Sequence, residues 1–197
     1  MGDAYTAQAV EGRTPDHEWY LDTLSERLQR GTTLLDLGCG AGIPTTMRLA
    51  EDFDVTGVDI SPGQTARARK NVPNATFVTA DIAEVDFPPN SFDAVTAFYS
   101  IIHVPREEHY ALFQSVVRWL RPGGVFMGSL SASGKGQAAS YEGDFFGAHM
   151  YWSNYDAIAN QRMVAEAGLQ IVMADQKTHD FNDETETWLW ILAAKPR

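Results

Sequence analysis

The sequence predicts an α/β fold: one doubly wound, mostly parallel sheet with helices on both faces. Short apolar runs alternate with helical patterns through the centre of the chain, which is typical of a parallel sheet covered on both sides. A glycine-rich turn follows the first apolar run. The 197 residues, 44% of them hydrophobic, suffice for one domain with its own core. We therefore expect a single domain over residues 1–197.

Seven apolar runs, bounded by turn residues, are expected to be strands: Thr33–Leu37, Asp54–Val58, Thr76–Thr79, Asp93–Phe98, Val125–Leu130, Gln170–Gln176 and Thr185–Ala194. Five stretches with helical spacing are expected to be helices: Pro15–Gln29, Ile43–Glu51, Pro62–Asn71, Arg106–Leu120 and Ser153–Ala167. Ser61 is the expected N-cap of the third, because a proline follows it. The Arg121–Gly124 stretch, Arg-Pro-Gly-Gly, predicts a turn before the fifth strand.

Two segments lie outside this alternation. Residues 1–30 are predicted to form an N-terminal helical cap over the site or the sheet edge. Residues 131–152 begin with small residues and end with aromatic ones, so we expect a lid insertion there.

Composition limits the function. The formal net charge of −11 disfavours a nucleic-acid partner, and the densest basic stretch, residues 67–70, is spaced like a solvated helix face. The single cysteine, Cys39, cannot form an internal disulfide and fits a reducing compartment. No apolar run is long enough to span a bilayer, so we expect a cytoplasmic protein without a membrane partner. Both a monomer and a homodimer are compatible with the sequence.

The strongest motif is Leu34-Leu-Asp-Leu-Gly-Cys-Gly-Ala-Gly42, an apolar strand followed by three glycines. Glycine there allows positive φ and close approach of the backbone to a ligand. The dinucleotide fingerprint requires a further glycine where Ile43 stands, so this turn departs from it. Asp59 ends the next strand about 20 residues later, where an acidic side chain can accept both ribose hydroxyls.

This loop resembles the first motif of the class I S-adenosylmethionine-dependent methyltransferases. Thr79-Ala-Asp-Ile82 is similar to the family's adenine-binding motif, Phe92 to His103 to the segment that passes the sulfonium, and Leu120–Gly124 to the turn before the fifth strand. The resemblance covers about Leu34 to Leu130 and implies strand order 3-2-1-4-5-7-6 with the last strand antiparallel. It implies cofactor contacts by Asp36, Gly38, Cys39, Gly40, Asp59, Ile60, Asp81, Ile82 and Phe98.

The resemblance also implies the reaction: in-line transfer of a methyl group from S-adenosylmethionine to a small molecule, leaving S-adenosylhomocysteine. Positioning and desolvation would dominate catalysis, because the cofactor is already activated. A base is needed only if the acceptor must lose a proton, and His103 is the candidate. Its alternative role is to bond the backbone before Pro105, while Tyr99 either touches a reactant or only packs.

The candidate acceptor contacts are aromatic side chains and a histidine of the cap and lid: Tyr5, Tyr20, His149, Tyr151 and Trp152. Each could instead belong to the core. No metal is expected, because Asp93 in the fourth strand has no adjacent carboxylate. The fourth motif also lacks the Asn/Asp-Pro-Pro-Tyr segment of base methyltransferases. Two alternatives stay open: a nicotinamide-dependent oxidoreductase, and a cofactor-binding module of the same fold without turnover.

Overall fold

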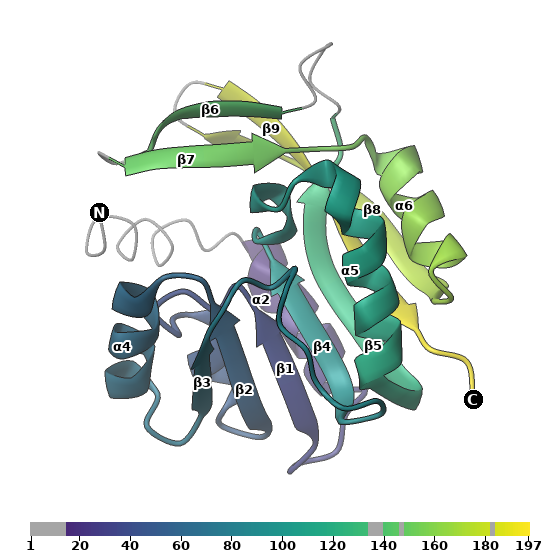
Figure 1. The fold of residues 1–197 in the computed structure, drawn as a ribbon. Helices are drawn as coiled ribbons and strands as arrows, with labels where there is room; N and C mark the ends of the chain where they lie inside the picture. Colours follow the sequence, from purple (N-terminus) through teal and green to yellow (C-terminus); the bar gives the residue numbers. More distant parts are fainter. Residues whose placement is uncertain (1–14, 134–139, 146–147, 182–183) are drawn as a thin grey trace.

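The computed structural model describes residues 15–133, 140–145, 148–181 and 184–197. Within them, one seven-stranded sheet has the order β3-β2-β1-β4-β5-β9-β8 (Figure 1). Its strands are β1 (Thr33–Leu37), β2 (Asp54–Asp59), β3 (Thr76–Thr79), β4 (Phe92–Phe98), β5 (Leu120–Ser131), β8 (Gln170–Phe181) and β9 (Glu184–Ala194). Counted within this sheet alone, the order is 3-2-1-4-5-7-6. Strand β9 runs antiparallel to both neighbours, so the expected topology is confirmed.

Helices cover both faces of the sheet. They are α2 (Pro15–Ser25), α3 (Thr45–Leu49), α4 (Pro62–Asn71), α5 (Arg106–Trp119) and α6 (Ala157–Glu166), with a short 3-10 helix η1 (Ile101–His103). In Figure 1, α5 and α6 lie in front of the sheet and α2 lies behind it. Side chains of α2, α3 and α4 share one buried cluster, and those of α5 and α6 share the other. The doubly wound arrangement follows from these two apolar layers.

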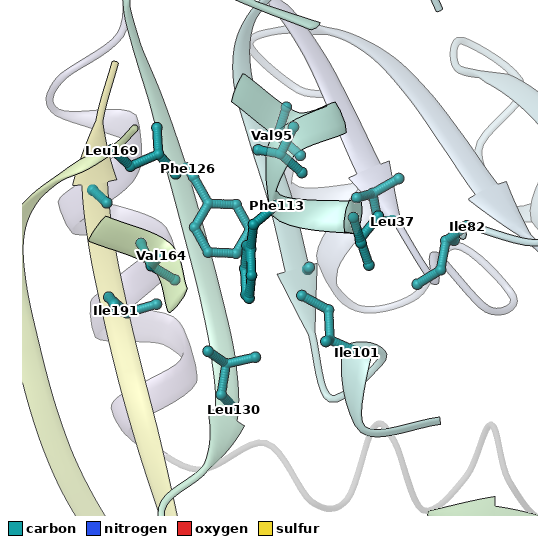
Figure 2. Close-up of a cluster of buried hydrophobic side chains, with 14 of the residues drawn as sticks. Leu37, Ile82, Val95, Ile101, Phe113, Phe126, Leu130, Val164, Leu169 and Ile191 are labelled. Atoms are coloured by element: carbon teal, nitrogen blue, oxygen red, sulfur yellow. The ribbon is translucent and has the colours of Figure 1, made fainter. Parts of the chain in front are cut away.

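The cluster under α5 and α6 shows how the layers meet (Figure 2). Phe113 of α5 and Phe126 of β5 pack edge to face, with ring centroids 5.7 Å apart. Around them lie aliphatic side chains from neighbouring strands, including Leu37 and Val95. Because Leu37 immediately precedes the glycine turn, this core fixes one end of that turn.

Helix boundaries test the expected caps. Ser61 does cap α4, because its side chain accepts a hydrogen bond from the Gln64 amide. The expected start of the last helix at Ser153 was wrong: α6 starts at Ala157, and Asp156 caps it by accepting from the Ala159 amide. Ser153 instead ends a strand and accepts from the Arg106 amide, which ties that strand to α5.

The expected turn at residues 121–124 is an irregularity within β5. Leu120 pairs with Phe92, and Val125 pairs with Ala94, so four residues of β5 stand opposite Asp93 alone. Gly123 adopts a φ of +82° there. The turn residues therefore bend a continuous strand and do not begin a new one.

Residues 140–153 contain a two-stranded hairpin that was not predicted as strands. It is formed by β6 (Ser140–Phe145) and β7 (Ala148–Ser153), outside the main sheet. In Figure 1 the hairpin lies above the carboxyl end of β4, next to η1. Contacts between β7 and η1 confirm that neighbourhood. The expected lid segment thus has its own regular structure in its second half.

Candidate functional site

The glycine loop, residues 38–42, connects β1 to α3 at the carboxyl end of the sheet. Gly38, Gly40 and Gly42 have φ values of +76°, +55° and +78°. The amides of Gly38 and Cys39 both donate to the Val58 carbonyl, at 2.8 and 2.9 Å, which ties the loop to β2. Cys39, which follows Gly38 in the sequence, is buried.

Two of these glycines have different surroundings. A Cβ at Gly38 would lie 2.2 Å from the Cβ of Ser100, whereas a Cβ at Gly40 would meet nothing within 4 Å. Gly38 therefore serves close packing of the loop on the end of β4. Gly40 faces open space, where a ligand can approach the backbone.

Asp59 ends β2 beside Gly40. Its two carboxylate oxygens accept from the amides of Gly40 and Ser61, both at 2.9 Å. Burial raises the pKa of Asp59, and these two hydrogen bonds oppose the rise. Each carboxylate oxygen can accept a further hydrogen bond, so this group fits a ligand that carries two hydroxyl donors.

Asp36 lies beneath the loop and does not reach out of it. Its oxygens accept from the hydroxyls of Thr46 at 2.6 Å and Thr96 at 2.9 Å. Burial raises the pKa of Asp36 to about 6, and the negative charge of Asp59 adds to the rise. The expected cofactor contact is thus corrected to an indirect one: Asp36 contributes buried negative charge under the loop.

The expected cofactor contacts that follow β2 and β3, namely Ile60, Asp81 and Ile82, are divided between surface and core. Ile60 has 65% of its surface exposed, an unusual position for a large apolar side chain beside a polar loop. Asp81 uses one carboxylate oxygen to accept from the Ala83 amide. Ile82 is buried in the core near Leu37, so its side chain packs within the protein and Ile60 offers the free apolar surface (Figure 2).

The carboxyl end of β4 carries an aromatic cluster. Tyr99 has a φ of +54°, which is strained for a non-glycine residue, and its amide donates to Ser129 Oγ at 2.8 Å. The Tyr99 ring packs edge-on against Trp188, with centroids 4.6 Å apart. Phe98, expected at the cofactor, is 8% exposed, and its ring lies 4.9 Å from that of His17.

His17 lies beside the candidate site, and the sequence analysis did not single it out. It is buried in α2, and its Nε2 lies 3.2 Å from Thr45 Oγ1, at the start of α3. The N-terminal helix therefore touches both the end of β4 and the segment after the glycine loop. Spacing along α2 could not reveal this, because the partners are far away in sequence.

His103 closes η1 and faces the hairpin. Its Nδ1 lies 2.8 Å from the Tyr151 carbonyl oxygen, and its ring centroid is 5.8 Å from that of Trp152. Burial lowers the pKa of His103, while the Tyr151 carbonyl and the charge of Asp59 oppose that change. The structure thus places His103 against the backbone of Tyr151 and beside the ring of Trp152.

Other acceptor candidates lie elsewhere. Tyr20 is fully buried and stacks on Trp190 with parallel rings 4.3 Å apart, so its expected acceptor role is corrected to a core role. His149 is on the exposed side of the hairpin, where its Nε2 lies 2.7 Å from a carboxylate oxygen of Glu142. Tyr5 lies outside the described residues.

Replacing Tyr20 with phenylalanine tests this correction. The hydroxyl of Tyr20 donates to Asp175 Oδ2 at 3.0 Å, which joins α2 to β8. We expect Tyr20→Phe to lower the free energy of unfolding by about 1 kcal/mol, because the stacking stays and one hydrogen bond is lost. Urea denaturation measures it. A change in acceptor KM without a loss of stability would restore the acceptor role.

Among the residues that the structure describes, no three metal-ligating side chains gather as a metal ion would require. No helix in the described ranges is long and apolar enough to cross a membrane.

A doubly wound sheet with a glycine loop after β1 and an acidic residue ending β2 is typical of domains that bind a nucleotide cofactor. Residues 34–124 match the family model of the methyltransferase domain. A 2-methyl-6-phytyl-1,4-hydroquinone methyltransferase of Synechocystis is 38% identical over 112 residues, 54% of this chain and 33% of that protein. Phosphoethanolamine N-methyltransferase 1 of Arabidopsis thaliana is 30% identical over 161 residues, 78% of this chain and 32% of that protein.

Solved structures agree on the fold. A methyltransferase from Methanosarcina mazei superposes with a TM-score of 0.77 at 16% identity, covering 88% of this chain and 97% of that one. The N-methyltransferase NodS of Bradyrhizobium japonicum, bound to S-adenosylhomocysteine, gives 0.73 at 18% identity, covering 92% and 87%. Residues 34–124 therefore resemble the methyltransferase domain family, and the chain has the fold of the solved S-adenosylmethionine-dependent methyltransferases. It spans about a third of the length of these curated relatives.

Proposed function

We propose that this protein binds S-adenosylmethionine in the glycine loop and transfers its methyl group to a small-molecule acceptor. The observation that carries the proposal is the juxtaposition of Gly40 and Asp59. Gly40 faces open space, and the carboxylate of Asp59 borders it with room for two hydroxyl donors. A ribose diol supplies such donors.

The remaining parts of the cofactor fit the neighbouring residues. The exposed side chain of Ile60 offers an apolar surface for the adenine ring, and Asp81 retains one carboxylate oxygen for its amino group. Asp36 and Asp59 provide negative charge for a ligand with an ammonium and a sulfonium. The bound cofactor would supply an activated methyl group, so the chain itself contributes orientation and exclusion of water.

The sequence of the glycine loop disfavours the alternative function, a nicotinamide-dependent oxidoreductase. Ile43 occupies the position of the third fingerprint glycine, and Gly42 already packs against Ala68 and Val72 of α4 and its cap.

The acceptor would lie between η1 and the hairpin. We propose that β6 and β7 act as a lid, because Tyr151 and Trp152 contact His103 at the carboxyl end of the sheet. The relatives' names specify acceptors as different as a hydroquinone and phosphoethanolamine, so their likeness does not select one. The single cysteine keeps the cytoplasm as the proposed compartment, in a single domain that is a monomer or homodimer.

The experiment compares the two ends of β2. Asp59→Ala is expected to weaken binding of S-adenosylmethionine by about 1 to 3 kcal/mol, roughly 5-fold to 150-fold, because the ribose loses its acceptor. Asp54→Ala, at the start of the same strand and exposed, is the matched control and should bind normally. Isothermal titration calorimetry measures both. Equal affinity in the Asp59 variant and wild type would remove Asp59 from the site.

A further inference from the structure

His103 has a defined tautomer. Its Nδ1 lies 2.8 Å from the Tyr151 carbonyl oxygen, which can only accept a hydrogen bond. Nδ1 therefore carries the proton, and in the neutral ring Nε2 has the lone pair. No hydrogen bond to Nε2 is made by the part of the chain that the structure describes. The hairpin backbone thus orients His103 as a proton acceptor.

His103 is held close to the cofactor loop. Ser100, three residues earlier, donates from Oγ to the Leu37 carbonyl at 2.7 Å and packs directly on Gly38. The His103 amide donates to the Ser100 carbonyl at 3.0 Å, so η1 is fixed to this contact. The charge of Asp59 also acts on the imidazole, which places both side chains at one end of the sheet.

The surroundings of His103 suit a planar, uncharged molecule. Trp152 is partly buried, and its ring is tilted by 54° to the imidazole. Met150, two residues earlier in β7, lies on the same face of the hairpin and is also partly buried. An apolar wall therefore stands beside a neutral base, since burial lowers the pKa of His103 below its ordinary value.

We propose that the acceptor is an aromatic molecule with a ring hydroxyl, and that Nε2 of His103 removes the hydroxyl proton as the methyl group is transferred. This rests on the proposed function. The hydroxyl oxygen forms the new bond to the methyl carbon, the carbon–sulfur bond breaks with its electron pair on sulfur, and the proton moves to Nε2 and then to water. A phenolic hydroxyl ionises near pH 10, so it needs this base, whereas an aromatic thiol does not.

The test uses matched acceptors and a matched variant. The probes are 2-naphthol and 1-naphthol, with 2-naphthalenethiol and 2-naphthylamine as controls. His103→Asn keeps an amide donor for the Tyr151 carbonyl but removes the base. We expect it to lower kcat/KM for the hydroxyl probes by about a hundredfold or more and for the thiol by less than about threefold. Equal losses on hydroxyl and thiol would overturn the proposal.

Two further readouts separate this inference from the proposed function. Calorimetry should show that His103→Asn binds S-adenosylmethionine like wild type. If the wild-type protein binds the cofactor and methylates the amine but neither hydroxyl probe, the proposed acceptor class is wrong. The proposed methyl transfer to a small molecule then still stands. Nitrogen-15 NMR of the unliganded protein at pH 8 should show protonated Nδ1 and unprotonated Nε2 in His103, and the opposite tautomer would overturn the assignment.

Discussion

Gly38→Ala is expected to lower the free energy of unfolding by about 3 kcal/mol or more, the larger part from a steric clash. The backbone φ of +76° costs an alanine about 1 to 2 kcal/mol. The added Cβ would also lie 2.2 Å from the Cβ of Ser100, so the end of β4 must move. Such overpacking costs about 1 to 3 kcal/mol in a packed interior. Urea denaturation monitored by circular dichroism measures the loss.

Gly40→Ala is the matched control for this prediction. Its φ of +55° carries a similar backbone strain, but the added Cβ meets no atom within 4 Å. We expect a loss of only about 1 kcal/mol in stability. Its main effect should be weaker cofactor binding, because the methyl group occupies the open side of the loop. A stability loss in Gly40→Ala as large as that in Gly38→Ala would contradict the packing assigned to Gly38.

Asp36→Asn is expected to raise the stability of the unliganded protein at pH 7.5 by up to about 3 kcal/mol. The pKa of Asp36 rises from 3.8 to about 6 in the folded protein, and each pKa unit is worth about 1.4 kcal/mol. The hydroxyls of Thr46 and Thr96 can rotate to serve the asparagine amide as donors or acceptors. The variant therefore removes a buried charge and retains the hydrogen bonds.

The pH dependence of this effect has a definite sign. A carboxyl group with a raised pKa contributes stability below its unfolded value of 3.8, and the contribution is lost as the pH rises through about 6. Wild type and Asp36→Asn should thus be equally stable near pH 4 and differ most above pH 6. Denaturation curves at several pH values test this. A difference that is constant with pH would show that Asp36 ionises normally.

The same substitution should weaken cofactor binding. Asp36 places negative charge under the loop in which we propose that the cationic cofactor binds, and the asparagine does not. Binding of the proposed cationic cofactor therefore explains why the protein retains a buried carboxylate that lowers its stability. This is the usual conflict between stability and function at binding sites.

The strands of the main sheet and the cap of α4 were predictable because their signals are local. Apolar runs bounded by turn residues located all seven strands, and Ser61 followed by Pro62 located the start of α4. The β6–β7 hairpin was missed because Ser140–Phe145 contains glycine and two acidic residues, which are uncommon in strands.

The parts of the candidate site that depend on backbone conformation could be predicted from the sequence. The parts that depend on side-chain packing could not. The positive φ values of the glycine loop follow from the residue type. The burial of Tyr20 depends on Trp190, and that of His17 on Phe98 and Trp190, partners that only the fold brings near. Asp36 was placed correctly at the end of β1, but its direction depends on two threonines of other elements.

The most direct test of the account is calorimetric titration of the wild-type protein with S-adenosylmethionine, S-adenosylhomocysteine and NADH in parallel. The account predicts saturable binding of the first two and no heat from NADH, because Ile43 replaces the glycine that a dinucleotide needs. Binding of NADH alone would contradict the assignment of the glycine loop, and with it the proposed methyl transfer.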